Sequence, residues 1–298
     1  MVGGVGRHSK GEDLTMTQSS KPAAGGRKDL EVELPDRHDV LVSMLSGTGR
    51  GGVPLRSDFV QLREADPSGS RVSRLASFTT DPRSLDAYLL IHALASSKAP
   101  HEASYPGLVW AHAAGFTLTA SQKSARQQWS KSVNKLARLQ LIEAGRDKRQ
   151  AVYTLLHERG DGEPYTRPTK LAHGGWVTIP HAYWLEGWDQ KLTLAEKVML
   201  LISLDQKQRF ELPTNRTSEW YGVSESTAVR GFKGLRERGI LDAEPRTTID
   251  LSTKTMMRTV NVYTTVGIWT KANREKTMTV KRRRATPAKP SKKGDAVA

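Results

Sequence analysis

The sequence predicts a mainly α-helical α+β fold in which two helical arrays each end in a small β-hairpin, with disordered chain ends. Apolar residues recur at helical spacing over residues 82–142 and again over 193–241. Each array is followed by short stretches in which β-branched and polar residues alternate, which is the period of half-buried strands. Both chain ends are polar and lack such periodicity.

Composition restricts the class of protein. The chain has 298 residues, enough for about two domains of ordinary size. It contains no cysteine, which excludes disulfides and thiolate zinc sites and is typical of a cytoplasmic protein. No apolar run approaches the roughly 18 residues of a membrane span, and residues 1–26 lack the apolar block of a signal peptide. We therefore expect a cytoplasmic protein.

The charge predicts the kind of partner. The net charge is +15 and the pI is about 10.0, which favours a polyanion. From Lys271 onward the chain holds ten lysines and arginines against two acidic residues, so its end is predicted to be a disordered basic tail. The rest of the positive charge precedes Lys271, and we expect the folded part to be basic as well.

Changes in composition predict the domain boundaries. Six glycines and prolines between residues 158 and 175 indicate a linker between two domains. The expected segments are 1–36 (disordered), 37–157 (first domain, with N-terminal strands), 158–175 (linker), 176–270 (second domain) and 271–298 (disordered basic tail).

Strands are expected at the start of the first domain, over 39–45 and 57–63. Between them, residues 47–52 match the GxGxxG spacing of dinucleotide-binding loops. That motif must open a helix, whereas Val53 and Pro54 favour extended chain. We therefore expect a loop here and no nucleotide cofactor.

The first array is predicted to hold three helices and a hairpin. Pro106 begins the second of its apolar segments, as a proline in the first turn of a helix does. The expected elements are helices over 82–95, 105–114 and 120–142, strands over 142–145 and 151–156, and a turn at 147–150. An insertion is expected near residues 96–104, because the first helix lies farther from the hairpin than in the second array.

The second array begins with a strand at 176–180 and a helix whose first turn carries the capping box Thr193 to Glu196. One apolar face of this helix is expected to comprise Leu194, Val198, Leu201 and Ile202.

A short helix, a tight turn and a longer helix follow over residues 213–241. Gly222 suits the turn, Ser224 is a typical N-cap, and Gly239 is typical of a helix end. The apolar stripe of the longer helix is expected to comprise Val229, Phe232, Leu235 and Ile240. Strands over 242–249 and 257–265 complete a hairpin.

Three helices followed by a hairpin form a winged helix, and residues 176–266 resemble that family. The phrase GVSESTAVRGFKGLRERGIL (222–241) is similar to its recognition helix and the start of its wing. Aligning the sequence of the first array with that of the second pairs Trp129 with Ala228 and Val133 with Phe232. We therefore expect two tandem winged-helix domains. The stretch leading into LTLAEK (192–197) resembles plasmid replication initiators and related bacterial regulators. The resemblance implies binding to double-stranded DNA.

Candidate DNA contacts lie on the exposed faces of the two recognition helices and at the tips of the two hairpins. Arginine can bind guanine bidentately, glutamine can bind adenine, and serine or threonine can bind a base or a phosphate. The candidates are Ser226, Thr227, Arg230, Lys233, Arg126, Gln127, Ser130 and Lys131 on the helices, and Lys148, Arg149, Lys254 and Arg258 on the hairpins. For each residue alone, an ordinary solvated surface is the alternative. Five tryptophans are expected in the core or in domain packing: Trp110, Trp129, Trp184, Trp188 and Trp220.

No catalytic, metal or cofactor motif is found, and we expect a protein that is not an enzyme. The histidines lack metal-ligand spacing, and the chain has neither a phosphate-binding loop nor a nucleophile elbow. Three functions stay open: a plasmid or phage replication initiator, a transcriptional regulator, or a protein-interaction scaffold with incidental basic tails. Two arrays in one chain favour initiation, because they can read adjacent sites without dimerising.

Overall fold

The computed structural model describes residues 32–66, 68–168, 175–252 and 254–278. The described residues from Leu34 onward belong to one compact unit. Most of the chain ends that were expected to be disordered, residues 1–31 and 279–298, lie outside the described part.

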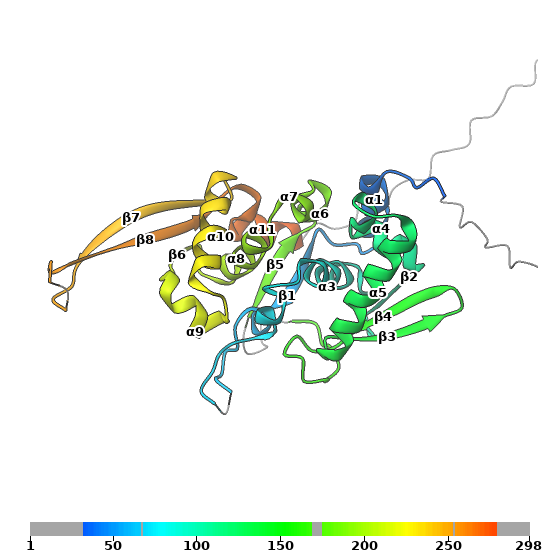
Figure 1. Ribbon diagram of the computed structural model, residues 1–298, viewed down its shortest axis with the longest axis horizontal. Coiled ribbons are helices and arrows are strands. Elements are labelled where there is room, and N and C mark those ends of the chain that lie inside the picture. Colours follow the sequence, from blue (N-terminus) through cyan, green and yellow to red (C-terminus); the bar gives the residue numbers. More distant parts are fainter. Residues whose placement is uncertain (1–31, 67, 169–174, 253, 279–298) are drawn as a thin grey trace, which may run out of the picture. The chain divides into compact units, whose positions relative to one another are not determined.

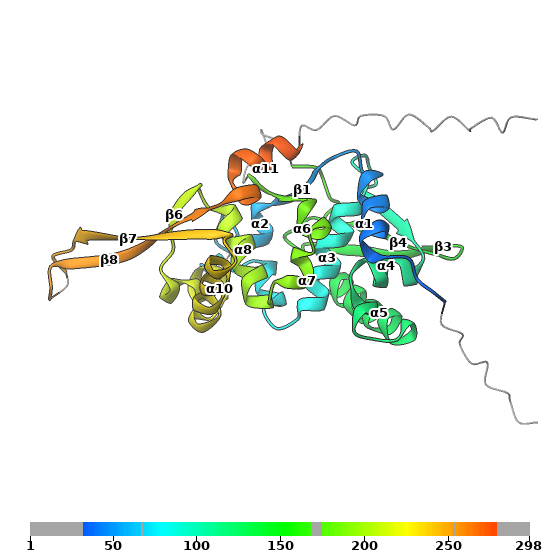
Figure 2. The same cartoon turned by 90° about the horizontal axis from the view of Figure 1, so that it is seen from above.

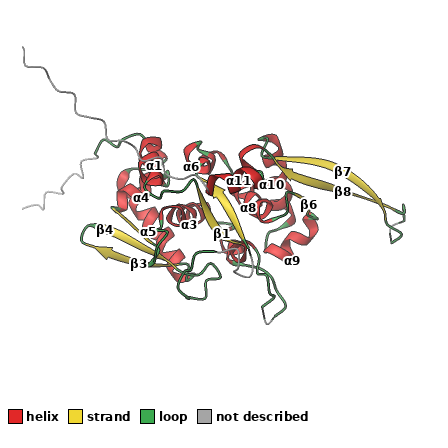
Figure 3. Ribbon diagram, turned by 180° about the vertical axis from the view of Figure 1, so that it is seen from behind, coloured by secondary structure: helices red, strands yellow, loops and turns green. Residues whose placement is uncertain are grey.

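Helices and small antiparallel sheets make up the described part, which confirms the predicted α+β class (Figures 1 and 3). Its strands form one two-stranded sheet and two three-stranded sheets. The two-stranded sheet pairs β1 (Gly52–Arg56) with β5 (Trp176–Pro180), with Leu55 opposite Val177. This pair joins segments that lie far apart in the sequence.

Residues 82–155, which we call the first array, combine helices with a three-stranded sheet. Its elements in chain order are α3 (Pro82–Leu94), β2 (Glu102–Tyr105), α4 (Gly107–Ala113), η2 (Phe116–Leu118), α5 (Gln122–Arg138), β3 (Ile142–Asp147) and β4 (Gln150–Leu155). In the sheet, β4 lies between β2 and β3. The insertion expected near residues 96–104 corresponds to the segment between α3 and β2 and to most of β2 itself.

Residues 194–265, the second array, repeat the order of one helix, one strand, two further helices and a hairpin, but here the short 3₁₀ helix precedes the second helix instead of following it. They are α8 (Leu194–Asp205), β6 (Arg209–Glu211), η3 (Thr214–Arg216), α9 (Thr217–Tyr221), α10 (Glu225–Glu237), β7 (Leu241–Ile249) and β8 (Met257–Thr265). Here β8 lies between β6 and β7, so the strand order also matches that of the first sheet.

Shorter elements lie outside the two arrays. They are α1 (Arg37–Ser46), α2 (Ser57–Val60), η1 (Arg74–Phe78), α6 (Ala182–Leu185), α7 (Trp188–Lys191), η4 (Gly267–Trp269) and α11 (Lys271–Met278). No helix in the described part of the chain combines the length and the apolar composition that crossing a bilayer requires.

Side-chain caps determine where the main helices begin. Thr193 and Glu196 form the predicted capping box at the start of α8. At the start of α10, the Ser224 hydroxyl accepts a hydrogen bond from the Thr227 amide at 3.3 Å.

The third helix of each array ends in the same way. Gly239 has the expected positive φ of 67°, and the Ile240 amide donates to the Leu235 carbonyl at 2.9 Å. In the first array Gln140 takes the place of that glycine with a φ of 56°, and the Leu141 amide makes the equivalent bond at 3.1 Å. A non-glycine residue in this conformation carries strain, which the shared hydrogen-bond pattern offsets.

The strands expected over 39–45 and 57–63 are wrong, because both stretches contain helix instead: α1 and α2. Asp36 caps α1, and Leu41 and Leu45 are buried one helical turn apart. A short run of apolar residues fits a strand and a helix equally well, and packing decided between them.

The disordered tail expected from Lys271 onward is wrong for α11. Arg274 is buried there, and burial lowers the pKa of its guanidinium to about 10. It donates hydrogen bonds to the backbone carbonyls of Trp269, Thr178 and Leu204. A basic helix without an apolar face is therefore held by tertiary hydrogen bonds that composition does not reveal.

The first part of the expected linker packs against β1 and against the first array. Glu158 is fully buried and accepts from the Arg56 guanidinium at 2.9 Å. Tyr165 is also buried, and its ring forms edge contacts with His92 and His101. Residues 169–174 of the expected linker lie outside the described part.

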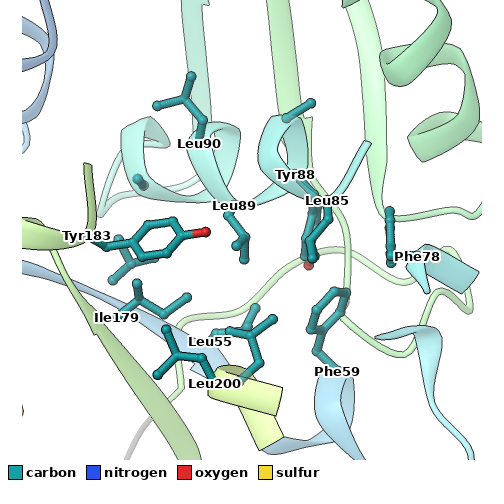
Figure 4. Close-up of a cluster of buried hydrophobic side chains, with 14 of the residues drawn as sticks. Leu55, Phe59, Phe78, Leu85, Tyr88, Leu89, Leu90, Ile179, Tyr183 and Leu200 are labelled. Atoms are coloured by element: carbon teal, nitrogen blue, oxygen red, sulfur yellow. The ribbon is translucent and has the colours of Figure 1, made fainter. Parts of the chain in front are cut away.

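One buried core spans segments on both sides of the expected linker (Figure 4). Leu55, Leu85 and Tyr88 contribute to it from β1 and α3. Ile179 and Leu200 come from β5 and α8, and Figure 4 shows them beside Leu55 and Leu89. The two arrays therefore share a core.

α8 is buried on all sides, rather than on one face as expected. Every residue from Glu196 to Leu204 is buried. Even its lysine is inside, where Lys197 Nζ lies 2.7 Å from the Asp86 carboxylate of α3. The helix contacts α10 on one side and both α2 and β5 on others, which keeps residues 196–204 out of solvent.

Candidate nucleic-acid interface

α10 divides into a packed face and a solvent face. Ser226, Arg230 and Lys233 are exposed, and Thr227 is half-buried. Arg230 extends along the helix, where its Nε donates to the Ser226 carbonyl at 3.3 Å. The residues on the opposite face are buried: Ala228, Gly231, Phe232, Gly234 and Leu235. The helix therefore presents hydroxyl and cationic groups to any ligand that approaches from solvent.

Glycines allow α10 to approach α8 closely. A Cβ on Gly231 would lie 2.5 Å from the backbone carbonyl oxygen of Ala195, which is closer than real contacts allow. Arg238 fastens the end of the helix, because its Nε lies 2.9 Å from Glu196 Oε1 of α8. Phe232 stacks on Tyr263 of β8 with ring centroids 4.1 Å apart. α8 and the hairpin thus determine the position of the solvent face.

Gly231→Ala is therefore expected to destabilise the chain by about 1–3 kcal/mol, because the extra methyl group forces two helices apart. In a helix with free space the same change stabilises by roughly 0.5–1 kcal/mol. Gly107 of α4 is the matched control, since a Cβ there would have no heavy atom within 4 Å. Urea unfolding of both variants measures the difference. A Gly231→Ala variant as stable as Gly107→Ala would contradict the close approach.

α5 has the same division between packed and exposed residues. Its four predicted contact residues, Arg126, Gln127, Ser130 and Lys131, are all exposed. Its buried residues Trp129, Ser132, Val133 and Leu136 have the spacing of Ala228, Gly231, Phe232 and Leu235 in α10. Both third helices therefore turn a polar face to solvent.

The packed face of α5 rests on aromatic rings. Trp129 stacks on Trp110 with ring centroids 5.4 Å apart. Its indole Nε1 donates to the hydroxyl of Tyr153, on β4, at 2.8 Å. Trp110, Trp129 and Trp184 are buried, whereas Trp188 and Trp220 are half-buried. These contacts orient α5 against its own hairpin, as Phe232 and Tyr263 orient α10.

Val229 is wrongly placed in the predicted apolar stripe. It is 49% exposed and stands beside Arg230 on the solvent face, whereas Ala228 is buried. Spacing alone did not separate two adjacent small apolar residues. An exposed valine between polar groups can contact the methyl group of thymine, so the sequence reasoning missed a residue of the candidate interface.

The two hairpins differ in length and at their tips. β3 and β4 have 6 residues each, and Lys148 and Arg149 are exposed in the turn between them. β7 and β8 have 9 residues each, and Lys254 and Arg258 are exposed near the distal end. All four predicted hairpin contacts are thus accessible to solvent.

Two hollows in the described part can be compared with the predicted contact residues. A cavity of about 720 Å³ is lined by Arg63, Asp205 and Arg274 among others, and none of the predicted contact residues lines it. Burial raises the pKa of Asp205 in this cavity. A hollow of about 440 Å³ lies beside Lys233, at the end of α10. Within the described residues, no group of three or more histidines or acidic residues could hold a metal ion.

Comparison with known proteins adds no relative: no family model, no curated protein and no solved structure matches this chain.

Proposed function

We propose that the chain binds double-stranded DNA through two winged helices, with α5 and α10 as recognition helices. The observation that carries this proposal is the pair of third helices. Each packs one face on its own array and turns hydroxyl, amide and cationic side chains to solvent. An α-helix fits the major groove of B-DNA, where such groups can distinguish base pairs.

The repeated order of elements supports the winged-helix interpretation. In both arrays a helix, a strand, two further helices and a hairpin follow one another, and the last hairpin strand is central in the sheet. The net charge of +15 supports a polyanionic partner. Two recognition helices in one chain with a shared core suit a plasmid- or phage-type replication initiator, or a transcriptional regulator, that reads two adjacent half-sites.

The first experiment identifies the target. The full chain is incubated with a pool of duplexes that contain a random central stretch, and the retained duplexes are sequenced. A recovered motif, called the selected duplex here, is the expected result. If the chain retains no duplex above a mock column, the proposed function is wrong.

Arg230→Ala is expected to weaken binding to the selected duplex by about 1–3 kcal/mol, or roughly 5–150-fold, and to relax preference at one base pair. Binding to a scrambled duplex should change much less, because base contacts specify and phosphate contacts only position. Fluorescence anisotropy measures both affinities. Arg83→Ala is the control, since Arg83 is an exposed arginine outside both third helices. Equal losses on both duplexes would make Arg230 a phosphate contact only.

A further inference from the structure

The distal end of the β7–β8 hairpin gathers large apolar side chains in solvent. Ile249 and Leu251 are each 80% exposed, and Met256 and Met257 are each 59% exposed. Single exposed apolar residues are common on protein surfaces, but a group gathered at the end of one hairpin is typical of an interaction site. We call these four residues the apolar tip.

The apolar tip stands on a ribbon that extends beyond the rest of its sheet. β6 pairs only with the part of β8 from Val262 to Thr264. From the Pro245–Asn261 pair to the Ile249–Met257 pair, β7 and β8 pair only with each other among the described strands. At about 3.3 Å per residue this section is roughly 13 Å long, before the turn is added. Figures 1 and 2 show the hairpin reaching past β6.

The hairpin of the first array provides an internal comparison. Its third strand, β2, pairs with β4 as far as Ala151, which adjoins the last pair of the hairpin, Asp147 with Gln150. Its turn carries Lys148 and Arg149 and no large apolar residue. The ribbon that extends beyond β6 and the apolar tip are therefore features of the second array. They do not follow from the order of elements that the two arrays share.

Register places the apolar residues together. Ile249 and Met257 are directly opposite each other in the ladder, so their side chains lie on one face of the ribbon. Leu251 and Met256 continue from them into the turn. Threonines precede the apolar tip along the ribbon, and the hydroxyls of Thr247 and Thr259 lie 2.9 Å apart across the two strands. The result is a narrow wedge of isoleucine, leucine and methionine on a polar stem.

We propose that the apolar tip enters the minor groove of the bound duplex and inserts between two base pairs, so that the DNA bends. This inference rests on the proposed function. Isoleucine, leucine and methionine are among the side chains that unstack base steps from the minor groove. Only Arg238, Gly239 and Ile240 separate the end of α10 from β7, so the ribbon begins beside the helix proposed to lie in the major groove.

The charges near the tip favour DNA as its occupant. Lys254 and Arg258 are exposed there and can contact the phosphates that border the groove. The acidic residue of the turn is Asp250, which accepts from the Ser252 hydroxyl at 2.5 Å and from the Ser252 amide at 3.0 Å. These hydrogen bonds lower the pKa of Asp250 and direct its carboxylate into the turn. The two cations therefore face outward against one carboxylate that is engaged locally.

A second copy of the chain is a poorer occupant. Four side chains on a narrow ribbon provide far less than the roughly 800 Å² per partner of a stable protein interface. Two such tips would also bring Lys254 and Arg258 against their own copies, and like charges oppose association.

Bending of the selected duplex tests the inference. The duplex carries a fluorescent donor and acceptor at its two ends, and energy transfer is measured at saturating protein. The tip variant combines Ile249→Thr, Leu251→Ser and Met256→Gln; all three positions are exposed, so its melting temperature should match that of the unmodified chain. The charge variant combines Lys254→Ala and Arg258→Ala.

The unmodified chain is expected to increase energy transfer, with a bend in the 20–90° range of wedge-inserting proteins. The tip variant should lose most of that increase and keep the salt dependence of binding, because it releases the same counterions. The charge variant should keep the bend at saturation, while the slope of log K against log salt falls by about two. If the tip variant misfolds, Leu251→Ser alone is tested in its place.

Each other outcome has a definite meaning. A tip variant that bends the duplex as strongly as the unmodified chain overturns the inference, and so does an unmodified chain that binds without bending. A tip variant that turns a dimer into a monomer in sedimentation, with bending unchanged, assigns the surface to self-association and also overturns it. Failure of the unmodified chain to bind any duplex is instead a failure of the proposed function.

Discussion

Replacing the polar face of α5 is expected to weaken binding of the full chain to the selected duplex by about 10²–10⁴-fold, although α10 is untouched. The variant combines Arg126→Ala, Gln127→Ala and Lys131→Ala. Once one recognition helix is bound, the other meets its half-site at a high effective concentration. The shared core keeps both helices on one folded body. Removing the contact face of one helix therefore removes all the affinity that simultaneous binding of the second half-site adds.

Fluorescence anisotropy and footprinting check this result. The control combines Arg83→Ala with Lys98→Ala, which removes two exposed positive charges from the first array without altering α5. The control should bind nearly as well as the unmodified chain, and its footprint should keep its length. The α5 variant should protect a shorter stretch of the duplex. An unchanged footprint would leave the first array as a structural or protein-binding domain.

Glu158→Gln is expected to destabilise the chain by about 3–5 kcal/mol, because it removes one partner of a buried ion pair. Glu158 is 0% exposed, and its carboxylate accepts from the side chain and the backbone amide of Arg56 at 2.9 and 3.2 Å. His92 Nε2 lies 3.5 Å away. Burial alone would raise the pKa of Glu158, but His92 and Arg56 outweigh it and lower that pKa.

Urea unfolding at neutral pH measures the effect. Glu163→Gln is the matched control, since Glu163 lies in the same segment and is exposed, and it should change the free energy of unfolding by less than about 0.5 kcal/mol. A carboxylate with a lowered pKa stabilises the fold above the ordinary pKa of glutamate, and this contribution is lost as the pH falls. The Glu158→Gln variant should therefore lose less stability on acidification. Equal stability of both variants at neutral pH would show that residues near Glu158 are a linker after all.

The candidate site was largely predictable where a single helix determines it. The eight predicted contact residues on α5 and α10 lie at exposed or half-buried positions, because helical spacing separates a packed face from a solvent face. Val229 was placed in the apolar stripe because of its hydrophobic character and spacing, but the packing of α10 leaves it 49% exposed. The apolar tip was not singled out, because the sequence does not show that β6 pairs only with the part of β8 from Val262 to Thr264.

The sequence by itself determined the second array and the ends of its helices. Thr193, Ser224, Gly222 and Gly239 act on the backbone within a few residues, so their effect can be read locally. The α+β class followed from two periods, one helical and one of strands, that extend over many residues. These features depend on interactions that are close in the sequence.

Only the tertiary structure decided the helices α1 and α11 and the packing of the segment after β4. Each depends on distant partners: Arg37 of α1 bonds to the Ala113 carbonyl, Arg274 of α11 bonds to the Thr178 carbonyl, and Glu158 bonds to Arg56. The same holds for α8, whose full burial depends on α2, β5 and α10 surrounding it. Charged residues such as Lys197 and Glu158 read as surface or linker in the sequence, because burial of a charge becomes favourable only when folding brings its partner within hydrogen-bonding distance.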